Sequence, residues 1–109
     1  MVLLDFWESW CGHCIESIPL LQKLADEYHD DLIVITITTE NAPQIRKIIK
    51  ANNISYVNIH AEKQILSDYS IKARPAYVLI DANGIIVEHT AGDLERISLA
   101  IKLKKLRRY

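Results

Sequence analysis

The two cysteines of the chain, Cys11 and Cys14, lie two residues apart in the segment DFWESWCGHC, directly after an apolar run. Cysteines at this spacing suit a metal site, a structural disulfide or a redox-active dithiol. They supply half of a zinc site, and the four histidines form no His-x(3–5)-His pair, so we expect no metal. A structural staple is disfavoured because closing so short a loop removes little chain entropy. Redox chemistry is the remaining interpretation.

The position of Cys11 favours redox chemistry, because an apolar strand-like run ends just before it and a helical pattern begins just after it. At a helix start, unpaired backbone N–H groups and the helix dipole stabilise a thiolate, which is the nucleophilic form of cysteine. Cys14 would lie one turn further along, within reach of a mixed disulfide formed at Cys11. Gly12 allows a tight turn, and His13 in its cationic form would stabilise the Cys11 thiolate further.

Composition indicates a single domain over residues 1–109, half of whose residues are hydrophobic. The 13 basic and 14 acidic side chains give a formal charge of −1, which argues against a nucleic-acid partner. The apolar runs are strand-sized, so we expect no membrane insertion, and no signal peptide or lipidation motif is visible. Because Met1 directly precedes the first strand-like run, we expect a domain excised from a longer protein. We also expect a monomer.

Hydrophobic periodicity predicts alternating strands and helices. Strands are expected at residues 2–7, 32–38, 56–60, 76–80 and 85–89, and helices from residue 12 to 28, from 41 to 53, at 62–69 and from 93 onward. We expect a kink at Pro19, N-caps at Asn41 and Asp93, and a hairpin turn at Asn83-Gly84. This order predicts a three-layer α/β domain whose mainly parallel sheet carries antiparallel strands at one edge.

The segment VLLDFWESWCGHC resembles the strand-and-motif region of the thioredoxin superfamily, and its Cys-Gly-His-Cys is the version typical of protein disulfide isomerases. The later YSIKARPAYVLIDANGIIV is more similar to the TlpA/ResA-type branch of thiol–disulfide oxidoreductases, as are the extra helix and strand at 42–60. The resemblance runs from Val2 to about Ile101. It implies a thioredoxin fold: a mixed central sheet of about five strands, helices on both faces and a helix–strand insertion.

The resemblance also implies roles for the cysteines and for a proline loop. Cys11 would be the nucleophile and Cys14 the resolving cysteine, with no cofactor beyond their own disulfide. Pro75 would be the family's cis-proline beside the disulfide, although an X-Pro bond is usually trans. Arg74 would pair with the backbone of the bound substrate. Gly92 matches a glycine packed near the active-site loop.

The buried acid of thioredoxins falls on Asp5, six residues before the first cysteine. It would take or supply the proton of Cys14, with a pKa raised by burial in the strand. The alternative is an acid near a strand end that reaches water. Of the two tryptophans, Trp7 is expected in the core, whereas Trp10 is expected to shield the disulfide and contact the partner.

The sequence departs from the branch at two positions. Ser17 stands where the branch often has a glutamate three residues after the second cysteine, and Glu16 lies one position earlier. Asp5 is therefore the better candidate for proton transfer. Arg74 precedes the proline where small or β-branched residues are common. Our hypothesis is that its fixed positive charge favours the Cys11 thiolate and acidic substrate segments.

The leading hypothesis is a thiol–disulfide oxidoreductase that acts on cysteine-containing proteins and is regenerated by an upstream redox partner. The family resemblance places it in the periplasm or cell envelope. The alternative is a thioredoxin-fold binding module of a larger protein, with a non-catalytic dithiol. The direction of electron flow stays open, since the branch favours a reductant whereas His13 and Arg74 favour a more oxidising pair.

Overall fold

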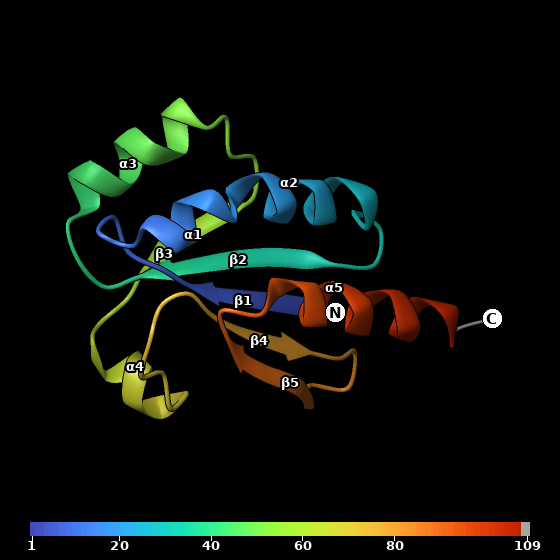
Figure 1. The fold of residues 1–109 in the computed structure, drawn as a ribbon. Helices are drawn as coiled ribbons and strands as arrows, with labels where there is room; N and C mark the ends of the chain where they lie inside the picture. Colours follow the sequence, from blue (N-terminus) through green and yellow to red (C-terminus); the bar gives the residue numbers. More distant parts are fainter. Residues whose placement is uncertain (108–109) are drawn as a thin grey trace.

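A mixed five-stranded sheet forms the centre of the computed structural model, which describes residues 1–107 (Figure 1). Along the chain the elements are β1 (Val2–Phe6), α1 (Gly12–Glu16), α2 (Ile18–Glu27), β2 (Ile33–Thr38), α3 (Ala42–Ala51), β3 (Val57–His60), α4 (Gln64–Asp68), β4 (Ala76–Ile80), β5 (Ile86–Ala91) and α5 (Leu94–Leu106). The strand order is β3-β2-β1-β4-β5, with β1, β2 and β3 parallel and β4 and β5 antiparallel to their neighbours. The predicted α/β architecture is confirmed, including the edge hairpin and the helix–strand insertion α3–β3.

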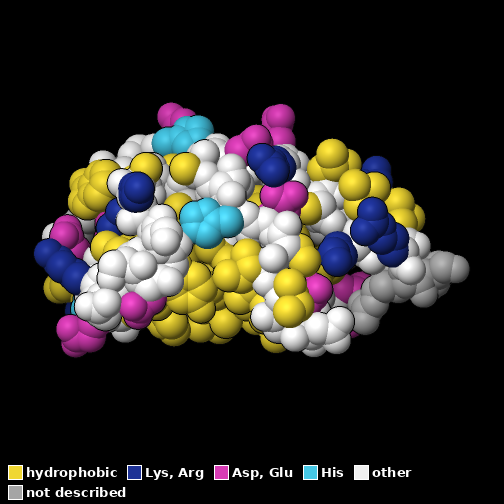
Figure 2. Space-filling model, turned by 90° about the horizontal axis from the view of Figure 1, so that it is seen from below, with side chains coloured by type: hydrophobic (Ala, Val, Ile, Leu, Met, Phe, Trp, Pro, Cys, Tyr) yellow, Lys and Arg dark blue, Asp and Glu magenta, His cyan; other side chains and the backbone are white. Residues whose placement is uncertain are grey.

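Helices cover both faces of the sheet. On one face, α2 and α5 bury a cluster made of Leu3, Val34, Tyr77 and Leu79 from the strands and Leu21, Leu24, Leu94, Ile97 and Ile101 from the helices. The short α4 covers part of the other face, where Ile65 and Leu66 pack against Leu4, Phe6 and Val78. Hydrophobic side chains gather in one area on the underside of the molecule (Figure 2). No helix in residues 1–107 is long and apolar enough to cross a bilayer.

Two helix caps and one turn glycine shape the connections between the elements. The Asn41 side chain accepts the N–H of Gln44 at the start of α3, and Asp93 accepts the N–H of Arg96 at the start of α5. Gly84 takes the left-handed conformation, with φ of 79°, in the turn between β4 and β5. The predicted caps and hairpin are therefore confirmed.

The first predicted helix is wrong in one respect, because it is two helices rather than one kinked helix. α1 ends at Glu16 and α2 begins at Ile18, with Ser17 between them. Pro19 lies in the first turn of α2 and lacks the N–H that a continuous helix would need at that position. The break leaves Cys14 on a short helix whose N-cap residue is Cys11.

Candidate active site

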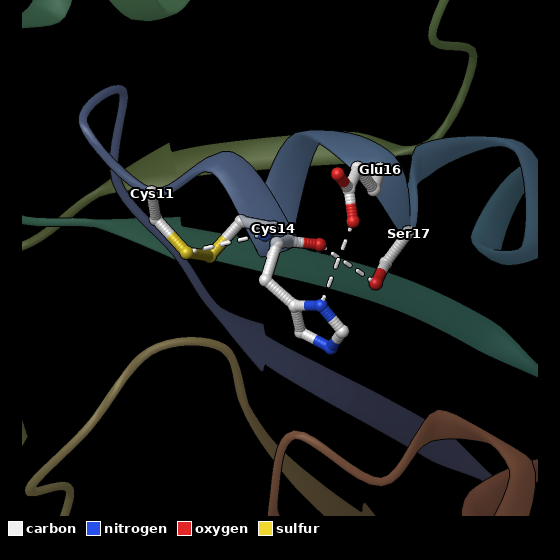
Figure 3. The surroundings of a disulfide bond; sticks show 5 residues. Cys11, Cys14, Glu16 and Ser17 are labelled. Carbon is white, nitrogen blue, oxygen red and sulfur yellow. Dashed lines mark hydrogen bonds and ion pairs between the residues drawn. A yellow bond between two sulfur atoms is a disulfide. The ribbon is translucent and has the colours of Figure 1, made fainter.

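Cys11 and Cys14 form a disulfide at the start of α1, with Cα atoms 5.3 Å apart (Figure 3). Cys11 is the N-cap residue, and its Sγ accepts the backbone N–H of Cys14 at 3.1 Å. Both cysteines are buried. A hydrogen bond aimed at this sulfur would stabilise a Cys11 thiolate after reduction. Residues 1–107 contain no group of three or more His, Cys, Asp or Glu side chains arranged to hold a metal ion.

His13 and Glu16 lie on the exposed side of α1. Their side chains approach to 3.8 Å, and the Ser17 hydroxyl donates to the His13 carbonyl at 2.9 Å (Figure 3). A hollow of about 420 Å³ lies beside them and reaches the start of α5, with Gly92 in its lining. The structure thus brings the predicted His13 and Gly92 to one surface depression next to the disulfide helix.

The loop before β4 carries Arg74 and Pro75 of the predicted site. The Arg74–Pro75 peptide bond is cis. The N–H of Gly92 donates to the carbonyl of Pro75 at 2.9 Å, and the φ of Gly92 is 76°, a value that favours glycine. Arg74 is half-buried, and its Nε has no hydrogen-bond partner within residues 1–107. This nitrogen is itself buried, so the side chain would have to move for it to contact a bound molecule.

Asp5 is buried in β1, with 3% of its surface exposed, so the alternative that it reaches water is wrong. The strand register places Thr36 of β2 on one side of it and Tyr77 of β4 on the other. Burial raises the pKa of Asp5 from its ordinary value of 3.8 to about 8. Near neutral pH Asp5 can therefore exchange a proton, as a general acid or base requires.

The tryptophans and the glycine of the motif divide between core and surface. Trp7 is buried in one cluster with both cysteines, and its Nε1 donates to the Asn58 side chain at 3.0 Å. Trp10 is 64% exposed. A Cβ placed on Gly12 would meet no atom within 4 Å, and the residue begins α1. The φ of Gly12 lies outside the left-handed region, so this position does not require the conformational freedom of glycine.

Glu8 is a site residue that the sequence interpretation missed. Its side chain is almost fully buried. One carboxylate oxygen accepts the N–H and the hydroxyl of Thr39, each at 2.8 Å, and the other accepts the N–H of Glu40 at 3.2 Å. Its own carbonyl accepts the N–H of Cys11 at 3.2 Å. Glu8 therefore ties the segment before the disulfide to the loop after β2.

Comparison with known proteins agrees with this geometry. The Redoxin family model matches residues 1–103. The chain belongs to the Redoxin family. It is 28% identical over 106 residues to the thioredoxin-like protein YneN of Bacillus subtilis, which covers 94% of this chain and 62% of that relative. It is also 28% identical over 100 residues to the thiol-disulfide oxidoreductase ResA of Halalkalibacterium halodurans, which covers 88% of this chain and 57% of that relative.

Solved structures show the same fold for this Redoxin-family chain. A Chlorobium tepidum protein named as the thiol:disulfide interchange protein DsbE superposes with a TM-score of 0.82 at 26% identity, covering 92% of this chain and 78% of that one. The thioredoxin domain of a Bacteroides vulgatus thiol-disulfide oxidoreductase gives 0.80 at 22% identity, covering 92% and 78%. The chain therefore has the thioredoxin fold, and it spans less than two thirds of the two curated relatives named above.

Proposed function

We propose that the chain is a thiol–disulfide oxidoreductase that exchanges disulfides with cysteine-containing proteins. The observation that carries this proposal is the Cys11–Cys14 disulfide, whose Cys11 sulfur already accepts a backbone N–H. Membership of the Redoxin family and the names of the relatives support it. By the same resemblance we place the chain, as a monomer, in the periplasm or cell envelope.

In the reducing direction, the Cys11 thiolate attacks one sulfur of a substrate disulfide. The substrate S–S bond breaks, one substrate sulfur leaves and takes a proton, and a mixed disulfide remains. Cys14 gives its proton to Asp5 and attacks the Cys11 sulfur, so the second substrate sulfur leaves and the Cys11–Cys14 disulfide forms. Two electrons pass to the substrate, and an upstream dithiol partner restores the reduced chain. The reverse sequence oxidises a substrate dithiol.

The proposed binding surface surrounds the disulfide. Trp10, which is largely exposed, would contact the partner, and Gly12 leaves space for its approach. The cis peptide at Pro75, held by Gly92, presents Arg74 to the substrate backbone. An extended substrate segment that pairs with this loop would bring its sulfur to Cys11.

Reduction of insulin by dithiothreitol tests the proposal. We expect the chain to accelerate insulin precipitation, and we expect Cys11→Ser to abolish the acceleration because the nucleophile is lost. Reduced Cys14→Ser, mixed with insulin after dithiothreitol has been removed, should instead accumulate a mixed disulfide, visible on a non-reducing gel, since nothing resolves it. A rate equal to that of Cys11→Ser would contradict the proposal and support a binding module with a non-catalytic dithiol.

Arg74→Thr is expected to raise the pKa of the Cys11 thiol and to make the reduction potential more negative, by on the order of 10–30 mV. The reason is that the guanidinium stabilises the thiolate of the reduced form. The potential is measured in glutathione buffers by tryptophan fluorescence. Lys72→Thr, which removes an exposed charge two residues earlier, is the matched control and should change little. Equal potentials for the Arg74 variant and the parent would refute this role.

The same titration gives the direction of electron flow for the parent chain. A potential near about −270 mV, as in thioredoxin, would make the chain a reductant. A potential near about −180 mV, as in protein disulfide isomerase, would make it an oxidant or isomerase.

A further inference from the structure

Asp5 and Tyr77 are two buried polar residues on adjacent strands of the sheet. Asp5 on β1 lies directly opposite Tyr77 on β4 in the antiparallel register. Side chains in such a pair share one face of the sheet, with Cβ atoms about 4.5–5.5 Å apart. Both residues are buried, and neither Asp5 Oδ1 nor the Tyr77 hydroxyl has a hydrogen-bond partner within residues 1–107. Folded proteins rarely leave such atoms unpaired, so a buried acceptor and a buried donor on the same face of neighbouring strands need an explanation.

The other neighbours of Asp5 are weaker candidates for a hydrogen bond to its carboxylate. Thr36, opposite Asp5 on β2, already donates its hydroxyl to the Asn58 side chain at 2.6 Å. Tyr56 packs at the edge of the same cluster and is half-buried. The buried side chains that α2 and α5 turn toward this face are aliphatic: Leu21, Leu24, Leu94, Ile97 and Ile101. Within the described residues, the titratable groups that interact electrostatically with Asp5 are therefore Tyr56 and Tyr77.

Tyr77 keeps its proton over the range in which Asp5 titrates. Burial, and then the proximity of Asp5, raise the pKa of Tyr77 to about 12, against a smaller lowering by the Ser17 side chain, which competes with Asp5 for the Tyr77 hydroxyl. Burial and Asp5 also raise the pKa of Tyr56. The Tyr77 hydroxyl is consequently a donor throughout that range, whereas an ionised Asp5 is purely an acceptor.

We propose that Tyr77 is a positioning residue for Asp5: its hydroxyl donates a hydrogen bond to the Asp5 carboxylate when that carboxylate forms. The hydrogen bond sets the pH at which Asp5 becomes able to accept the proton of Cys14. In that step the proton moves from the Cys14 sulfur to Asp5, and Tyr77 keeps its own. The link to Cys14 rests on the proposed oxidoreductase function, but the Asp5–Tyr77 hydrogen bond does not.

The direct test is a ¹³C NMR titration of the Asp5 carboxyl in the oxidised chain. Tyr77→Phe should raise the titration midpoint by about one pH unit, because the charged form loses a donor. Tyr28→Phe is the matched control, since Tyr28 belongs to the same buried cluster at the far end of α2, and it should leave the midpoint unchanged.

Two further variants keep the test decisive. A 3-fluorotyrosine at position 77, a stronger donor in the same space, should lower the midpoint, and it serves if the phenylalanine variant folds poorly. Tyr56→Phe should move the midpoint less than Tyr77→Phe does. An unchanged or lowered midpoint in Tyr77→Phe overturns the proposal, and so does a larger shift in Tyr56→Phe, which would make Tyr56 the donor.

The catalytic consequence is read separately. The pH profile for resolution of a Cys11 mixed disulfide by Cys14 should shift upward in Tyr77→Phe by the same amount as the carboxyl midpoint. A carboxyl shift in a chain that reduces insulin no faster than Cys11→Ser would support the hydrogen bond and refute the oxidoreductase function. Insulin reduction by a chain whose carboxyl midpoint does not shift in Tyr77→Phe would support the oxidoreductase function and refute the hydrogen bond.

Discussion

Replacing Glu8 with alanine is expected to lower the melting temperature of the oxidised chain by about 15 °C. The replacement removes the acceptor of two hydrogen bonds from Thr39 and one from the Glu40 N–H. A hydrogen bond to a charged group contributes roughly 1.5–3 kcal/mol, and bonds that share one carboxylate are not additive, so a total loss of about 3 kcal/mol is expected. For a domain of this size each kcal/mol corresponds to roughly 4–8 °C. Calorimetry or circular dichroism measures the change.

Glu40→Ala is the control for Glu8→Ala, because it removes the same charge from a neighbouring exposed side chain. The Glu40 carboxylate makes a surface ion pair with Lys63 at 3.4 Å, and such pairs contribute little. Glu8→Gln should lie between the two, since its amide keeps one acceptor oxygen for Thr39 and turns a donor toward the Glu40 N–H. If Glu8→Ala melts no lower than Glu40→Ala, the hydrogen bonds of Glu8 between the disulfide segment and the β2–α3 loop do not contribute to stability.

Features encoded within a few neighbouring residues were predictable from the sequence. The caps at Asn41 and Asp93 and the turn at Gly84 depend on side-chain or backbone preferences acting over three or four positions, and the structure has all three. The cysteines at the start of a helix follow from the same local pattern. The break at Ser17 was also a local effect, but a proline is compatible both with a kink and with a new first turn.

The unpredicted part of the site depends on pairing across the chain. The partners of Glu8 lie 31 and 32 residues away, and nothing beside it in the sequence distinguishes it from a solvated acid. Tyr77 meets Asp5 through the register of β1 with β4, which no short-range pattern specifies. Asp5 itself could be proposed because a family resemblance pointed to it, whereas its burial became evident once β2 and β4 were placed on both sides of it.

Asp5→Asn is expected to make the oxidised chain more stable at alkaline pH. Asp5 titrates with a pKa of about 8 when folded and near 3.8 when unfolded. Between these values the unfolded chain has lost the proton and the folded chain retains it, so the free energy of unfolding falls as pH rises. The slope from this group is at most about 1.4 kcal/mol per pH unit, and the asparagine variant lacks it. Urea unfolding at pH 5, 7 and 9 should show a gap that widens up to about pH 8.

The same replacement should slow the proposed reaction, which separates a functional acid from a merely tolerated one. Asparagine cannot take the proton of Cys14, so insulin reduction near neutral pH should fall by about 10²-fold, the lower range for loss of a general base. Asp30→Asn, at a side chain that is 85% exposed, should change neither property. If the difference in free energy of unfolding between Asp5→Asn and the parent does not change with pH, Asp5 is ionised in the folded chain. A more stable variant with full activity would show that the buried acid has no part in thiol exchange.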